Sequence, residues 1–256
     1  MSPEEKSVGE EERHASVLRF TRRQRIEHHV MAALFIVLTV TGLPQKFSDS
    51  FWAGSVVRLI GEVDFMRWLH RMAGFAFAGF TGYFLIFAAL DILRGRTALS
   101  MAPFLSDLKE VYHGLLWAAG LGKRPAAGRF DYREKLEFWG MLLGSGVMIA
   151  TGLILYFPIQ ATRWLPGEVI PAAKTAHSYE AMLALMVIVV WHLYNAMLRP
   201  GVFPFDTTII HGRMSLERLR EEHPLEYARL FPEEAAEGGG EGEDSHGASA
   251  PRPGPA

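Results

Sequence analysis

Hydrophobic residues along the chain are gathered into four long runs, which polar segments separate. The runs cover about residues 26–43, 67–93, 136–157 and 173–198, and the first one ends at the helix breaker Gly42-Leu43-Pro44. Each run is close to the roughly 20 residues that a helix needs to cross about 30 Å of hydrocarbon. The pattern predicts an all-α integral membrane protein, a bundle of four spanning helices.

Basic residues flank these runs unevenly. Lysines and arginines cluster before the first run, between the second and third, and after the fourth, whereas the loops 44–65 and 158–171 contain few of them. Because basic loops stay in the cytoplasm, both termini are predicted to be cytoplasmic, in a bacterial inner membrane. The first 24 residues are too polar for a signal peptide, so the first run is interpreted as a permanent span.

The remaining segments suggest how the chain is organised. Residues 103–121 are mixed in polarity and predict an amphipathic helix at the membrane interface. We divide the chain into a polar N-terminal extension (1–17), a four-span domain (18–200), a cytoplasmic C-terminal helix region (201–232) and a tail (233–256). The tail is rich in Gly, Glu, Ser and Pro, a composition typical of disorder.

Four histidines, His28, His70, His177 and His192, lie near the ends of the apolar runs. Ionisable side chains are costly in hydrocarbon and are kept there mainly for function. In the predicted topology, His28 and His192 lie near the cytoplasmic surface, and His70 and His177 near the outer one. The two in the fourth span are 15 residues apart, a rise of about 22 Å with about 60° of rotation beyond four turns. This arrangement predicts two noncovalent b haems, each held by two histidines as iron ligands.

Other features support this prediction without requiring it. The chain has no cysteine, which excludes Cys-ligated clusters and covalent haem attachment. Arg25, Arg67 and Lys174 each lie three residues before one of the histidines, where a cation can meet a haem propionate or simply anchor the helix at the interface. Any single histidine could be structural. The roles of His29, His113 and His211 stay open.

Several stretches resemble the cytochrome b (gamma) subunit of respiratory formate dehydrogenases, within the four-helix dihaem cytochrome b family. They are "RIEHHVMAALFIVLTVTGL", "RWLHRMAGFAF", "REKLEFWGMLLGSGVMIATGLILYFP" and "HSYEAMLALMVIVVWHLYNAML", and "HGRMSLERLREEHPLEY" is similar to the family's cytoplasmic C-terminal helix. The resemblance covers about residues 18–230 and implies the pairing of His28 with His192 and of His70 with His177. The span-four histidines are one residue further apart than is usual in formate dehydrogenase members.

The resemblance also implies a quinone site beside the cytoplasmic haem. The corresponding residues would be Asp131, Tyr132 and Arg133, together with His192, for menaquinone or ubiquinone. The family often has Asn and Gly in this loop. Asp131 could hydrogen-bond a quinone oxygen or relay protons, or it could be an ordinary solvated carboxylate.

Taken together, the sequence predicts an electron-transfer anchor of a respiratory complex, with no affinity for nucleic acid. An iron–sulfur or multihaem cytochrome subunit and a catalytic subunit would be its partners, along with quinone and membrane lipids. The alternatives are a cytochrome b subunit of a hydrogenase or sulfur-compound reductase, a small transporter with a polar path along Glu180, His177 and Asn195, and an anchor without cofactor. Whether the chain is itself an enzyme stays open, because substrate chemistry would take place in the catalytic partner.

Overall fold

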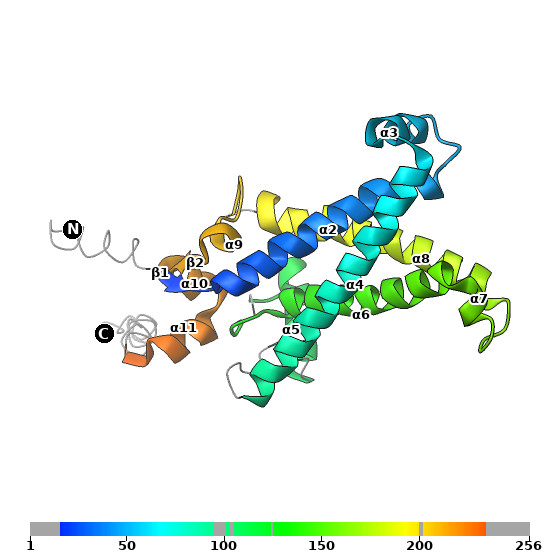
Figure 1. The fold of residues 1–256 in the computed structure, drawn as a ribbon. Coiled ribbons are helices and arrows are strands. Elements are labelled where there is room, and N and C mark those ends of the chain that lie inside the picture. Colours follow the sequence, from blue (N-terminus) through cyan, green and yellow to red (C-terminus); the bar gives the residue numbers. More distant parts are fainter. Residues whose placement is uncertain (1–15, 95–100, 103–104, 124, 200–201, 234–256) are drawn as a thin grey trace, which may run out of the picture. The chain divides into compact units, whose positions relative to one another are not determined.

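The structure is a computed structural model that describes residues 16–94, 101–102, 105–123, 125–199 and 202–233 (Figure 1). The predicted N-terminal extension up to residue 15 and the predicted tail from residue 234 lie outside these residues. The chain forms two compact units. We call residues 18–100 and 136–213 the helical bundle, and residues 1–17, 101–135 and 214–256 the second unit.

The helical bundle is built on four long helices. They are α2 (Arg22–Lys46), α4 (Val63–Leu93), α6 (Tyr132–Tyr156), which starts in the second unit, and α8 (Val169–Met186) with its π-helical continuations η1 (Val187–His192) and η2 (Tyr194–Leu198). All four are long and apolar enough to cross a membrane, which confirms the four predicted spans. Three short helices were not predicted: α3 (Ala53–Ile60), α7 (Pro158–Ala161) and α9 (Thr208–His211).

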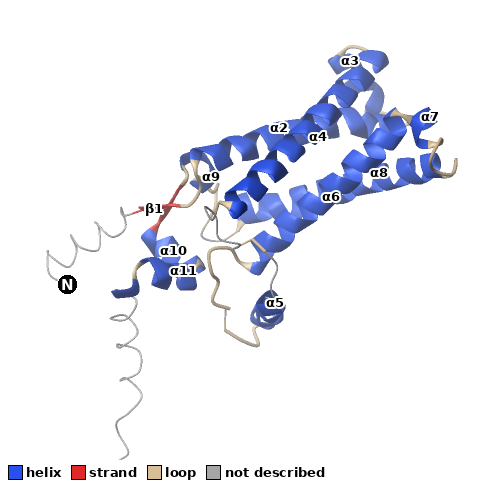
Figure 2. Ribbon diagram, turned by 60° about the horizontal axis from the view of Figure 1, so that its bottom comes forward, coloured by secondary structure: helices blue, strands red, loops and turns tan. Residues whose placement is uncertain are grey.

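Contacts between the long helices show that neighbours run in opposite directions (Figure 2). Arg23 at the start of α2 pairs with Asp91 at the end of α4, with 2.9 Å between NH1 and Oδ2. The Lys46 ammonium at the end of α2 donates to Ser178 Oγ near the start of α8, at 2.9 Å. Thr151 near the end of α6 contacts His177 of α8, so the four helices form an up-and-down bundle.

The outer surface of this bundle is apolar. Large side chains in the middle of the long helices are widely exposed, for example Ile86 at 60% and Leu143 at 67%. In contrast, Thr41 is only 1% exposed. Helices with apolar outer faces and internally satisfied backbones are the form that lipid requires.

One predicted boundary was wrong. The first span does not stop at Gly42-Leu43-Pro44, because α2 continues through Pro44 to Lys46. A proline removes one backbone donor, but the hydrogen-bond ladder resumes after it, and the Phe47 amide donates to the Leu43 carbonyl at 2.9 Å. The helix start is well defined: Thr21 and Gln24 form a capping box.

The fourth span departs from the regular α-helix that the sequence analysis assumed. From Val187 to Leu198 it is wound as two π-helical segments, and His192 is the last residue of the first. π-helical turns are rare and are often found at functional sites. The rotation of about 60° expected between His177 and His192 for a pure α-helix therefore does not apply.

The second unit contains α5 (Leu105–Ala118), α10 (Leu216–Glu222) and α11 (Pro224–Leu230), and a small sheet pairs β1 (Ser16–Leu18) with β2 (Arg213–Ser215). Met214, Leu219 and Tyr227 form its core. The resemblance implied a single C-terminal helix, but the structure has two. The first ends at His223, and a proline begins α11. The α5 helix lies within the predicted interfacial segment, but its location at a membrane surface stays a prediction.

Candidate functional site: two histidine pairs

The helical bundle brings two histidine rings together near one of its ends. His70 comes from the second turn of α4 and His177 from α8, and their ring centres lie 6.4 Å apart. The ring planes make an angle of 77°. The two side chains therefore approach each other from different helices.

A second pair lies at the opposite end of the bundle, near the start of α2 and toward the end of the fourth span. His28 of α2 and His192 of η1 have ring centres 6.1 Å apart, with the planes tilted by 34°. The His29 ring also contacts His28, edge to face with ring centres 5.5 Å apart, but it belongs to the same helix, and its Nδ1 hydrogen-bonds the Arg25 carbonyl at 2.6 Å. The structure thus brings together the same two pairs that were expected. Their role as haem ligands stays a prediction.

The His70–His177 pair has the same support on both sides. Thr41 Oγ1 lies 2.9 Å from His70 Nδ1, and Thr151 Oγ1 lies 2.9 Å from His177 Nδ1. Each threonine is followed by a glycine that faces the same ring. A Cβ on Gly42 would lie 3.1 Å from His70 Cε1, and one on Gly152 would lie 3.4 Å from His177 Cε1. A Thr-Gly dipeptide therefore contacts each of these two rings.

The His28–His192 pair has a different neighbour. The Glu137 carboxylate of α6 hydrogen-bonds His192 Nδ1. Both side chains are partly buried, 20% exposed for Glu137 and 32% for His192. A carboxylate that accepts a hydrogen bond from an imidazole N–H fixes the tautomer and the orientation of the ring.

The three cations expected beside the histidines have other surroundings. Arg25 NH1 donates to the Ile210 carbonyl. Arg67 lies 3.7 Å from Asp64, and its side chain is 53% exposed. Lys174 is exposed. Their contact with haem propionates stays a prediction.

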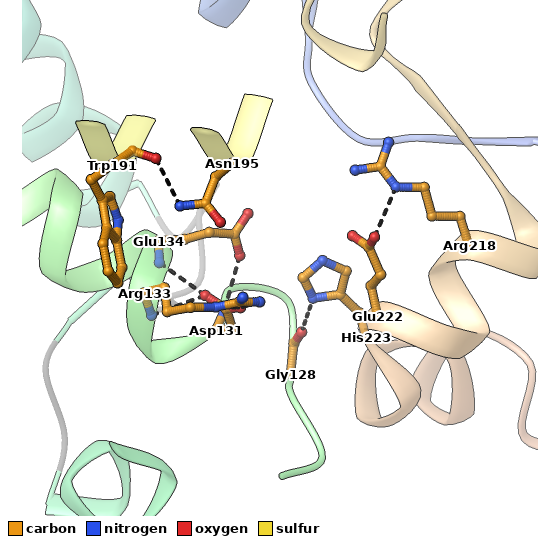
Figure 3. A network of polar contacts seen from close by, with 9 residues as sticks. All are labelled: Gly128, Asp131, Arg133, Glu134, Trp191, Asn195, Arg218, Glu222 and His223. Carbon is orange, nitrogen blue, oxygen red and sulfur yellow. Dashed lines mark hydrogen bonds and ion pairs between the residues drawn. The ribbon is translucent and has the colours of Figure 1, made fainter. Parts of the chain in front are cut away.

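The residues expected near a quinone lie in the second unit. Asp131 is the N-cap of α6: its Oδ1 accepts the amides of Arg133 and Glu134 at 2.9 Å each, and its Oδ2 accepts Arg133 Nε at 2.8 Å (Figure 3). Glu134 in turn accepts the Asp131 amide at 2.9 Å. This reciprocal capping box occupies both carboxylate oxygens of Asp131.

A small cavity lies beside this cap. Asp131, Tyr132 and Arg133 line it together with Glu110 of α5, and its volume of about 20 Å³ holds about one water. Burial, followed by the charge of Asp107, raises the pKa of the Glu110 carboxyl. Glu110 is therefore a further protonatable group at this position, which the sequence analysis did not select.

The sequence analysis missed three residues that contact the histidine rings: Thr41, Glu137 and Thr151. Two signals pointed to them. The tripeptide Thr-Gly-Leu occurs at residues 41–43 and again at 151–153, each time near the end of an apolar run. Glu137 is an ionisable side chain within a spanning helix, which by itself indicates function.

Comparison with known proteins finds relatives along most of this chain. The formate dehydrogenase cytochrome b556(fdo) subunit of Escherichia coli (strain K12) is 24% identical over 228 residues, which are 85% of this chain and 95% of the relative. The nitrate-inducible formate dehydrogenase cytochrome b556(Fdn) subunit of the same strain is 23% identical over 216 residues, 84% of this chain and 92% of the relative. Residues 19–203 match the family described as prokaryotic cytochrome b561. Since this match spans well over half of the sequence, the chain belongs to the prokaryotic cytochrome b561 family.

Proposed function

We propose that the protein is a dihaem cytochrome b subunit that anchors a respiratory oxidoreductase and passes electrons between a partner and the quinone pool. The observation that carries this proposal is the two histidine pairs, with ring centres 6.1 and 6.4 Å apart. Each pair joins two helices. Membership of a cytochrome b family implies haem b as the cofactor.

The spacing of the rings fits an iron ion held between them. A metal–nitrogen bond to histidine is about 2 Å long and the ring centre lies about 1 Å further, so two histidines that held one iron ion between them would have ring centres about 6 Å apart. No group of three or more His, Cys, Asp or Glu within the described part of the chain could hold a metal ion. A pair supplies two ligands only, which suits a haem whose macrocycle supplies the others.

The orientation of the rings also fits this cofactor. In three of the four histidines Nδ1 already has a partner, Thr41, Thr151 or Glu137. The opposite ring nitrogen, Nε2, is left as the ligand, as is usual for metal-bound histidine. Gly42 and Gly152 leave space on the flank of each ring that a side chain would fill.

A bound haem supplies one-electron transfer, and the chain contributes ligation, orientation and an apolar environment. Each haem would be held by two histidines that come from two different helices. Thr41, Thr151 and Glu137 hold three of the rings in place. In a membrane the apolar helices around them would exclude water, which influences the potential at which the electron is accepted.

The relatives suggest the partner. Two of them are named as cytochrome b556 subunits of formate dehydrogenase. By this likeness the chain serves a formate dehydrogenase, with an electron-transfer subunit and a catalytic subunit as partners. Because the chain has no cysteine, Cys-ligated iron–sulfur clusters would belong to those partners. A hydrogenase or a sulfur-compound reductase is the alternative complex.

The basic residues that flank the spans support the rest of the proposal. They favour a bacterial inner membrane with both termini in the cytoplasm, where the His28–His192 pair and a quinone site would lie. Quinone reduction needs protons as well as electrons. Water at this surface would provide them.

Haem analysis of the purified protein tests the proposal. We expect about two haems per chain by pyridine haemochrome assay, all of them extracted by acid–acetone because no cysteine attaches them. If the complex co-purifies with a formate-oxidising partner, formate should reduce both haems, and quinone should reoxidise them. One haem per chain, or none, would contradict the dihaem assignment, whereas reduction by hydrogen instead of formate would change only the partner.

A further inference from the structure

The histidine rings of the two pairs face different hydrogen-bond acceptors, threonine hydroxyls in one pair and a carboxylate in the other. Thr41 Oγ1 donates its proton to the Val37 carbonyl at 2.6 Å, and Thr151 Oγ1 donates to the Val147 carbonyl at 2.7 Å. A hydroxyl has one proton, and with that proton on the carbonyl each threonine oxygen is an acceptor for an Nδ1–H of the histidine ring. His70 and His177 therefore each donate an Nδ1–H to a neutral oxygen.

His192 donates to a carboxylate oxygen instead. Its Nδ1–H faces Glu137, and hydrogen bonds to an ionised acceptor are about twice as strong as those between neutral groups. A carboxylate that pulls on the Nδ1 proton makes the imidazole more basic and a better electron donor to a metal at Nε2. Glu137 comes from a third helix, α6, and so approaches the His28–His192 pair from outside the two helices that carry the rings.

We propose that Glu137 is a positioning residue that lowers the reduction potential of the haem at His28 and His192, and that the threonine-held haem lacks this influence. The proposal rests on the dihaem function proposed above. Electron donation from the ligand stabilises oxidised iron more than reduced iron, so the haem gives up its electron more readily. The carboxylate thus acts through His192 and contacts neither substrate nor quinone in this role.

Redox titration of the purified, haem-loaded protein tests this inference. Glu137→Gln keeps an oxygen acceptor and nearly the same volume but removes the charge. At a fixed ambient potential we expect the reduced-to-oxidised ratio of one haem to rise about tenfold, which is about 59 mV for a one-electron couple. The other haem should not shift, and the EPR g-values of the shifted haem should change with it.

Two control variants separate this effect from others. Glu180→Gln removes another carboxylate of the bundle, one that faces Gly144 on α6 and contacts none of the four rings by hydrogen bond. Thr151→Ser keeps the hydroxyl group that hydrogen-bonds His177. Neither should move the potential that Glu137→Gln moves. An equal shift in Glu180→Gln would mean that general charge in the bundle is responsible, and would overturn the proposal.

The remaining outcomes are equally decisive. Two haems with unchanged potentials in Glu137→Gln would refute the role of Glu137 while leaving the dihaem function intact. Loss of one haem in this variant would also refute it, because Glu137 would then be needed for occupancy. A wild-type protein with fewer than two haems would instead refute the dihaem function itself.

Discussion

The two histidine pairs have nearly the same spacing but different supports. The His70–His177 pair is held by two Thr-Gly dipeptides, one on α2 and one on α6, and its four supporting residues are small and neutral. The His28–His192 pair has one carboxylate, and its His192 stands in a π-helical segment. Because the ring spacing is nearly equal, the hydrogen-bond acceptors beside the rings are what distinguish one pair from the other.

Removing a ligand should have the largest effect and tests whether the pairs are separate. His70→Ala and His177→Ala should each lose one haem, and it should be the same haem in both. His28→Ala and His192→Ala should lose the other. Redox titration of membranes from each variant identifies which component disappears. If His70→Ala and His192→Ala lost the same haem while His177→Ala lost the other, the pairing would be wrong.

Filling the glycine positions should affect only the threonine-held pair. Gly42→Val should lose most of that haem because even a Cβ would lie 3.1 Å from the His70 ring. Gly152→Val should lose less, since the corresponding distance is 3.4 Å. Haem content per chain measures both effects.

Gly146→Val is the matched control, because a Cβ there meets nothing within 4 Å. Equal haem loss in Gly146→Val would show that any bulky residue in α6 disturbs the bundle. The contact with the His177 ring would then not explain the result for Gly152.

Removing a hydroxyl should have a smaller effect. Thr41→Val keeps the shape of the side chain but leaves His70 Nδ1 without its acceptor. Loss of such a partner costs about 10–100-fold in metal affinity, so the haem should dissociate faster into apomyoglobin. Thr41→Ser should restore the wild-type rate. A valine variant that holds its haem as tightly as wild type would exclude the hydroxyl as a support.

The smallest effect is expected at Asp131, outside both pairs. Asp131→Ala should lower the stability of the protein by about 1 kcal/mol because it removes an N-cap, whereas Asp131→Asn should have little effect because Asn caps nearly as well. Thermal unfolding measures this difference. Quinone-dependent haem oxidation gives a second measurement. A rate that falls in both variants would assign Asp131 to proton transfer, and a rate that falls in neither would leave it the structural role of a cap.

Much of the bundle could be predicted because lipid constrains a sequence strongly. A spanning helix must be apolar for about 20 residues, so the four helices could be located from composition alone. The helix ends were harder. Pro44 suggested a stop, but a single lost hydrogen bond did not end α2, and the ladder resumed beyond it.

The sequence by itself determined which histidines could meet. His28, His70, His177 and His192 are set apart by the cost of ionisable groups in hydrocarbon, and alternating helix direction sorts them into two levels. Only the tertiary structure decided which side chains hydrogen-bond the rings at Nδ1. Thr41 and His70 are 29 positions apart, and Glu137 and His192 are 55 apart. Such contacts depend on the rotation of each helix about its axis, including the π-helical turns before His192. Helix packing sets that rotation, and hydrophobic length does not encode it.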